Sequence, residues 1–296
     1  DNTKGIIITH LFGYPCEISK IQKIANKHNL KLIEDCAQSF GSYYENQHTG
    51  NFGNVGIFST SLVKIPTTLG GGIIVTNDKD LIKAVYDFNK QLPKSYVVYF
   101  KYFLKNFISL LNSKPFIYTL FSSKIFSILN KYNPRIYRKI IYSGMGLQKE
   151  FNPSERLDLK KYQINFGLDQ FENYSALRKK CEENSKYIQN NLNDVNEIEF
   201  LNYNQSTKWN HQYLVIKIRK DLKNFSKKMF DNKIHAMEEN VWNCLDYGYK
   251  IENQNENFDI TNKNNIKLLR IQNSPSLKKK ELDYIIKTIK KISKNI

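Results

Sequence analysis

One lysine stands in a stretch whose composition suits carbonyl chemistry. Lys64 lies between two short apolar runs, residues 56–59 and 71–76, which are bounded by Gly, Asn and Pro. Such runs are typical of short buried strands. A lysine amine that is partly desolvated condenses readily with an aldehyde to form a Schiff base. Lys64 is therefore a candidate for covalent attachment of an aldehyde cofactor.

Three further polar residues follow apolar runs near this lysine. Asp35 and Gln38 come after the run 31–33, and Ser59 closes the run that precedes Lys64. Open α/β sheets bind ligands at the carboxyl ends of their strands. A carboxylate that faces a pyridine nitrogen keeps the ring protonated, so the ring can withdraw electrons. Asp35, Gln38 and Ser59 are therefore candidate cofactor-binding residues.

The elements around these residues predict a parallel sheet. Residues 5–9 and 31–35 are expected strands, and residues 17–29 form an amphipathic helix between them. A strand, a helix and a strand in this order give a parallel pair with a right-handed crossover. The glycines 70–72 precede a strand and do not open a helix, so they do not predict a phosphate-binding loop.

The composition indicates a soluble globular protein with a strong positive charge. The chain has 296 residues, 13% aromatic residues and a mean hydropathy of −0.54, which is unlike a disordered chain. Its 45 Lys and Arg residues outnumber 28 Asp and Glu residues, giving a formal charge of +17. This charge favours anionic partners, although codon usage that enriches Lys, Asn and Ile explains it equally well.

The spacing of the cysteines and the hydropathy of the chain indicate the cellular compartment of the protein. The four cysteines, Cys16, Cys36, Cys181 and Cys244, form no CxxC pair, so we expect neither a zinc site nor a disulfide framework, and no metal-binding residue is assigned. The sequence shows no signal peptide, and its longest uncharged runs are too short to span a membrane. We expect a cytoplasmic protein.

Four segments in this order and spacing resemble the DegT/DnrJ/EryC1/StrS family of pyridoxal-phosphate-dependent nucleotide-sugar aminotransferases. The segments are THLFGYP, LIEDCAQSFG, GNFGNVGIFSTSLVK and TTLGGGIIVTND. The resemblance is nearly continuous over residues 5–92 and weaker from residue 159 to the C-terminus. It implies an α/β fold of PLP-dependent transferase fold type I, which is aspartate-aminotransferase-like.

The resemblance also implies roles for individual residues. Lys64 would form the Schiff base with pyridoxal 5'-phosphate and then move protons as general base and acid. Asp35 would pair with the pyridine nitrogen, Gln38 would lie against the ring or its 3-hydroxyl, and Ser59 would donate to the cofactor phosphate. Family dehydratases carry histidine in place of this lysine, so Lys64 favours amino transfer.

Two departures from the family affect the expected activity. Family members carry further strands and a Gly-Thr or Gly-Ser phosphate turn ahead of the point where this chain begins, so we expect an N-terminally truncated chain with a partial large domain. The family's Asn-aromatic-Arg triplet, which contacts phosphate across a dimer, falls here on Arg156, Leu157 and Asp158. Asn152 and Arg156 are present at a different spacing.

The segment 90–149 is basic and aromatic. It holds eleven Lys and Arg residues and no Asp or Glu, and Pro115 and Pro134 divide it into pieces of helical length. Basic amphipathic helices with aromatic residues bind anionic membrane surfaces. Three alternatives are therefore open for residues 95–142: peripheral membrane contact, packing as an inserted helical subdomain, and a dimer face. Nucleic acid is not an expected partner, because the aromatic residues stand among aliphatic ones.

The remaining chain predicts a linking helix and a small mixed domain. Residues 159–192 form one amphipathic helix with a bend near Gly167. Strands are expected at 213–219, 234–237 and 266–271, and helices at 221–231 and 282–292, with a surface loop at 253–265. The predicted organisation is a PLP-binding part (1–92), a basic aromatic insertion (93–150), the linking helix (151–192) and a small α+β domain (193–296).

The predicted function is amino transfer from glutamate to a keto nucleotide-sugar, by a homodimer that serves surface polysaccharide biosynthesis. The alternative is a non-catalytic relative that acts as a scaffold or membrane-associated subunit, which the altered triplet and the basic insertion favour. His10 and His48 lie in loops near the predicted site. Loop histidines are more often bystanders than ligands, so neither is included in the site.

Overall fold

The computed structural model describes residues 2–91, 96–112, 115–133, 159–201, 206–239 and 267–296. The chain divides into two compact units. The first comprises residues 1–77 and 165–296, and the second comprises residues 78–164. The segment with Asn152, Arg156, Leu157 and Asp158 and the predicted loop 253–265 lie outside the described residues.

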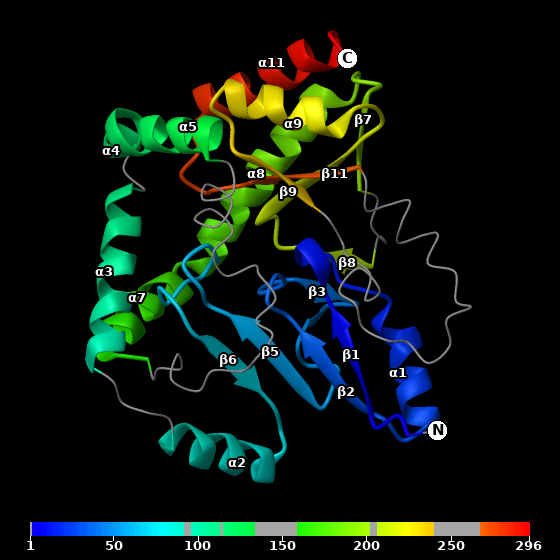
Figure 1. The fold of residues 1–296 in the computed structure, drawn as a ribbon. Coiled ribbons are helices and arrows are strands. Elements are labelled where there is room, and N and C mark those ends of the chain that lie inside the picture. The colour runs from blue at the N-terminus through cyan, green and yellow to red at the C-terminus, as the bar shows by residue number, and fades with distance from the viewer. Residues whose placement is uncertain (1, 92–95, 113–114, 134–158, 202–205, 240–266) are drawn as a thin grey trace. The chain divides into compact units, whose positions relative to one another are not determined.

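The first sheet of the first unit carries the predicted strands. Its order is β1 (Gly5–Thr9), β2 (Lys31–Asp35), β5 (Val55–Ser59) and β6 (Gly72–Val75). β1, β2 and β5 are parallel, whereas β6 is antiparallel to β5. Helix α1 (Ile18–Lys27) connects β1 to β2 (Figure 1), as the βαβ pattern predicts. Ile8, Ile18 and Leu32 form the core between the helix and the sheet.

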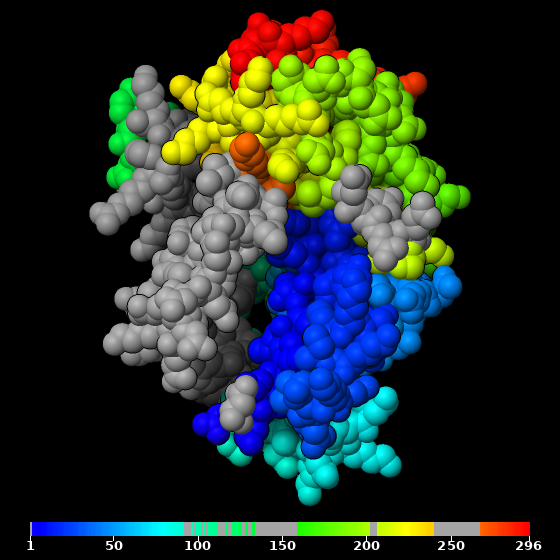
Figure 2. All heavy atoms as spheres, turned by 90° about the vertical axis from the view of Figure 1, so that its right-hand side faces the viewer, coloured from blue at the N-terminus to red at the C-terminus, as the bar shows by residue number. Residues whose placement is uncertain are grey.

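A small sheet that the sequence did not predict joins distant parts of the first unit. β3 (Tyr43–Tyr44) pairs with β4 (Gln47–His48) and with β8 (Thr207–Lys208). Each strand has only two residues, too few to show an alternating pattern. In the space-filling view, the blue N-terminal residues and the yellow-green residues of the second half of the chain adjoin each other (Figure 2).

The second sheet is antiparallel and carries the largest core. Its order is β10 (Ala236–Glu239), β11 (Leu268–Gln272), β9 (Tyr213–Ile218) and β7 (Ile198–Phe200). Helices α8 (Tyr174–Leu192), α9 (Leu222–Asp231) and α11 (Lys279–Ser293) pack with it around Ile216, Met229, Leu269 and Ile289 (Figure 1). The strand predicted at 234–237 begins two residues later, at Ala236, because the Ile234 amide still donates to the Met229 carbonyl of α9 at 3.0 Å. β7 was not predicted.

The predicted bend near Gly167 is wrong in its position. The chain forms two helices, α7 (Lys161–Glu172) and α8, which are separated at Asn173. The Asn173 side chain donates to the carbonyl of Asp169, 2.9 Å away, and thereby competes with the helical backbone. Gly167 instead allows close packing, since a Cβ there would lie 2.5 Å from the Thr68 methyl group.

The second unit is helical in its described part. Helix α2 (Lys79–Lys90) begins at Asp78, whose carboxylate accepts from the amides of Asp80 and Leu81. Helix α3 (Tyr96–Asn112), the short helix α4 (Pro115–Ile117), a π-helical turn (Tyr118–Ser122) and α5 (Ser123–Tyr132) follow. Among the residues that the structure describes, none of the helices meets the length and apolarity that a membrane crossing requires.

Candidate active site

The parallel strands bring the predicted acid to one edge of the first sheet. Asp35 ends β2 and lies in register with Thr9 at the end of β1 and with Ile57 in β5. Its carboxylate accepts from the Ala37 amide at 3.0 Å and from the Thr9 hydroxyl at 3.4 Å. These bonds fix the Asp35 side chain at the carboxyl edge of the sheet, where this class of fold binds its ligands.

Lys64 lies in the connection that leaves this same edge. β5 ends at Ser59, and the chain turns so that the Lys64 amide donates to the carbonyl of Ser61 at 2.9 Å. The hydroxyls of Thr60 and Thr68 lie 2.7 Å apart and close the base of the loop. The sequence-predicted lysine is therefore held by a short, internally bonded loop.

The amine of Lys64 contacts the second sheet. Its Nζ donates to the phenol oxygen of Tyr213, 3.3 Å away, at the start of β9. Gln212 donates to the same phenol oxygen at 3.1 Å and to the carbonyl of Val63 at 2.9 Å. Gln212 thus connects the strand that carries Tyr213 to the loop that carries Lys64.

Burial lowers the pKa of the Lys64 amine. Desolvation is the main cause and the positive charge of Arg270 the second, and together they lower the pKa of Lys64 to about 8. The carboxylates of Asp35 and Glu239 act in the opposite direction. A larger share of this amine is therefore neutral and nucleophilic at neutral pH than of an exposed lysine.

Gln38 and Ser59 lie at the same edge but make backbone contacts. The carboxamide oxygen of Gln38 accepts from the Phe12 amide at 2.9 Å. The Ser59 hydroxyl accepts from the Ser61 amide at 3.4 Å, a long bond that leaves the hydroxyl weakly held. Their contacts with a cofactor remain predictions.

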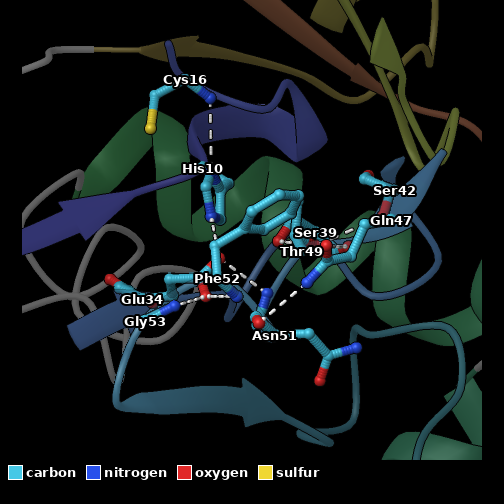
Figure 3. A network of polar contacts seen from close by, with 12 residues as sticks. His10, Cys16, Glu34, Ser39, Ser42, Gln47, Thr49, Asn51, Phe52 and Gly53 are labelled. Carbon is cyan, nitrogen blue, oxygen red and sulfur yellow. Dashed lines mark hydrogen bonds and ion pairs between the residues drawn. The ribbon is translucent and has the colours of Figure 1, made fainter. Parts of the chain in front are cut away.

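A buried carboxylate that the sequence did not single out supports this edge. Glu34, next to Asp35, is fully buried and accepts at 2.7 Å from each of the amides of Gly50, Phe52 and Gly53 (Figure 3). His10 lies 3.1 Å away on the other side. Burial disfavours the carboxylate, but these hydrogen bonds outweigh burial and lower the pKa of Glu34.

His10 belongs to this supporting network. The Cys16 amide donates to Nδ1 of His10 at 3.2 Å, so Nε2 carries the proton that His10 donates to Glu34 (Figure 3). The His10 side chain is fully buried, and its two ring nitrogens are hydrogen-bonded to Glu34 and Cys16. Its position in THLFGYP, next to a strand end, was the available signal, but its partner could not be inferred.

The same network contains three groups that can ligate metals. His10, Glu34 and Cys36 bring ligand atoms within 4.8 Å of one another. However, each Glu34 oxygen already accepts two hydrogen bonds, and Nδ1 of His10 accepts one. Burial raises the pKa of the Cys36 thiol to about 12, so the thiol stays protonated. Hydrogen bonding accounts for the cluster without a metal ion.

Comparison with known proteins agrees with the predicted fold. An aminotransferase from Psychrobacter cryohalolentis superimposes on 99% of this chain with a TM-score of 0.67 and 20% identity, and the chain covers 69% of that structure. The chain therefore has the α/β fold of the PLP-dependent transferases of fold type I, as predicted.

Sequence comparison then narrows this class. Residues 1–97 match the DegT/DnrJ/EryC1/StrS aminotransferase family. GDP-perosamine synthase of Escherichia coli O157:H7 is 43% identical over 91 residues, which are 31% of this chain and 25% of that protein. The dTDP-3-amino-3,6-dideoxy-alpha-D-galactopyranose transaminase of Aneurinibacillus thermoaerophilus is 41% identical over 80 residues, or 27% and 22% of the two chains. Residues 1–97 are thus similar to this family, and each of these matches spans a quarter or less of the relative's length.

Proposed function

We propose that this chain carries the reactive lysine of a pyridoxal-phosphate-dependent aminotransferase that acts on a keto nucleotide-sugar. The buried Lys64 amine, whose pKa is about 8, carries the proposal. The donor set at the sheet edge fits the cofactor, because an amine, a carboxylate and a hydroxyl match an aldehyde, a pyridine nitrogen and a phosphate. The name of the Escherichia coli relative, GDP-perosamine synthase, supports a nucleotide-sugar substrate.

The residues of the site have separate roles in this proposal. Bound pyridoxal phosphate would supply an aldehyde that accepts an amino group and a ring that withdraws electrons. Lys64 would hold the aldehyde carbon and, once released, take and return the proton of the carbon that bears the amino group. Asp35 would keep the ring nitrogen protonated, Gln38 would lie against the ring, and Ser59 would donate to the phosphate.

Peptide mapping tests this assignment. We expect borohydride reduction of the chain with pyridoxal phosphate to label Lys64 in preference to the exposed lysines. Glutamate, the proposed donor, is expected to prevent labelling when it is added before the reductant. Transfer of its amino group converts the cofactor aldehyde to an amine, which cannot form an imine with Lys64. Labelling spread evenly over exposed lysines would refute the proposal.

The proposal includes a homodimer in the cytoplasm whose product enters surface polysaccharide assembly. The described cysteines, Cys16, Cys36 and Cys181, are free thiols, which suits a reducing compartment. Light scattering of the purified chain tests the dimer.

We also infer a second role, peripheral membrane contact, from the second unit. Helix α3 exposes a stripe of apolar side chains at helical spacing, and α5 exposes further ones. The stripe of α3 comprises Val97, Phe100, Phe103, Leu104, Phe107, Ile108, Leu110 and Leu111. Phe100 is 64% exposed and Phe107 is 50% exposed, far more than core residues. With eleven basic and no acidic residues in 90–149, an anionic lipid surface fits this segment best.

Vesicle flotation measures this contact. We expect the chain to float with vesicles that contain anionic lipid and to stay at the bottom with purely zwitterionic ones. Replacing Phe100 and Phe107 by serine is expected to lower the floated fraction severalfold, whereas the matched exposed pair Ile24→Ser and Tyr284→Ser has no effect. A dimer that dissociates in the Phe100 and Phe107 variant, without loss of flotation, would instead assign the stripe to a dimer face.

A further inference from the structure

The second sheet places a buried ion pair behind the residue that contacts Lys64. Arg270 lies in β11, between β9 and β10, and is only 9% exposed. Its guanidinium lies over the Tyr213 ring, 4.5 Å from the ring centre. Arg270 also forms an ion pair with Glu239 at the end of β10. A buried arginine in a central strand is costly unless it is paired, and here Glu239 supplies the pair.

Tyr213 links this ion pair to the lysine. Its phenol oxygen accepts from Lys64 at 3.3 Å, and the Lys64 nitrogen lies 5.6 Å from the centre of the same ring. One aromatic ring therefore contacts two cationic groups, Lys64 and Arg270. The Tyr213 side chain is almost fully buried, and Gln212 fixes its oxygen from a third direction. Such a ring has little freedom to move away from the amine.

We propose that Tyr213 is a positioning residue for the Lys64 amine and that the Arg270–Glu239 ion pair sets the charge state of that amine. The proposal rests on the proposed function only in that it makes Lys64 the reactive group. Arg270 opposes a proton on Lys64, and Glu239 favours one by neutralising Arg270. The second sheet would thus keep the lysine available as a neutral nucleophile and as a proton acceptor.

The charged groups around Lys64 agree with this arrangement. Arg270 from β11 lowers the pKa of Lys64 after desolvation, the largest cause, while Asp35 from β2 and Glu239 from β10 raise it. Tyr213 itself is neutral, because burial raises its pKa above the usual value. Removing the charge of Arg270 should therefore raise the pKa of the Lys64 amine, and removing the charge of Glu239 should lower it.

Competitive labelling measures this shift without cofactor or substrate. The whole 296-residue chain is acylated with acetic anhydride across about pH 6 to pH 11, and the Lys64 peptide is quantified by mass spectrometry. We expect Arg270→Gln to raise the pH midpoint of Lys64 acylation by about 0.5–1 pH unit, and Glu239→Gln to lower this midpoint by a similar amount. Arg270→Lys, which keeps the charge, is expected to stay close to wild type.

Tyr213→Phe tests the positioning role. This variant keeps the ring under Arg270 and removes the acceptor of the Lys64 proton, so we expect a lower midpoint. We also expect at least a severalfold loss of site selectivity in labelling by pyridoxal phosphate. The matched control is Arg219→Gln, which removes an exposed arginine paired with Glu199 at 4.0 Å on the same sheet. It should change neither quantity.

Folding and function are kept separate in this test. Circular dichroism identifies variants that unfold. If a single variant unfolds, the double variant Arg270→Gln with Glu239→Gln replaces it, because the double variant leaves no unpaired charge. The Lys64 midpoint of the double variant should lie near that of wild type. Midpoints that do not move, or that move in the same direction, would overturn the proposal. Failure of Lys64 to bind pyridoxal phosphate would refute the proposed function but would leave these midpoints as a valid test of the coupling.

Discussion

Lys64→Ala is expected to abolish site-specific trapping of pyridoxal phosphate by borohydride. With a pKa of about 8, about one Lys64 amine in ten is neutral at pH 7, against about one in three thousand for a lysine at the ordinary value. The weaker nucleophilicity of a less basic amine offsets part of this difference. A preference for Lys64 of about 10-fold to 100-fold over exposed lysines therefore remains, and the variant loses it.

The pH profile distinguishes Lys64 from other lysines. Because only the neutral amine attacks the aldehyde, the trapping rate should rise about tenfold per pH unit below the pKa and level off above about pH 8. The trapping rate of exposed lysines continues to rise until the pH approaches their ordinary pKa of 10.5. Stopped-flow absorbance of the imine measures both phases.

Two variants serve as controls for this prediction. Lys31→Ala removes an exposed lysine at the start of β2 and should leave the fast phase intact. Lys64→Arg keeps a positive charge in the loop but cannot form the imine, and it should behave as Lys64→Ala does. If Lys64→Ala kept a fast phase that levels off near pH 8, another amine would be the reactive one.

The sequence predicted those parts of the site that depend on local sequence pattern. Alternation of apolar runs with an amphipathic helix gives β1, α1 and β2, and the strand ends place Asp35 and Ser59 at one edge. A lysine within an otherwise apolar and glycine-rich loop marks Lys64. These inferences need only neighbouring residues, because strand direction and the position of the edge follow from the order of elements.

The contacts that tune the site were not predictable in this way. Tyr213 is 149 residues from Lys64, and its strand pattern shows only that it is buried. The partner of Arg270 lies on a neighbouring strand whose start was misplaced by two residues. In the same way, Glu34 appeared only as part of a motif, since its three amide donors come from a loop without periodic pattern. Such partners depend on the tertiary fold and not on local sequence.

Glu34→Ala is expected to destabilise the first unit by about 3–5 kcal/mol. The carboxylate is fully buried and receives three amide hydrogen bonds and one from His10. Alanine leaves all four donors without an acceptor, and each buried unsatisfied donor costs about 1–3 kcal/mol before relaxation and water entry. Urea unfolding followed by circular dichroism measures this loss. Because Glu34 adjoins Asp35, we also expect weaker retention of pyridoxal phosphate.

Glu34→Gln separates charge from shape. Its amide nitrogen would face either the Gly50 amide and His10 or the amides of Phe52 and Gly53, so donors oppose donors in both orientations and we expect a loss of about 2–4 kcal/mol. The pKa of Glu34 is lowered when folded, so its stabilisation is complete above the ordinary value of 4.5 and is lost as the pH falls through the lower folded pKa. The difference between wild type and Glu34→Gln should therefore narrow in acid.

An exposed glutamate provides the comparison. Glu17 is 51% exposed and pairs with Lys20 at 3.0 Å, so Glu17→Ala should change the free energy of unfolding by less than about 1 kcal/mol. Equal effects of Glu17→Ala and Glu34→Ala would show that the loop 50–53 does not depend on the buried carboxylate. The predicted contrast follows from burial, since water replaces the partners of Glu17 and cannot reach those of Glu34.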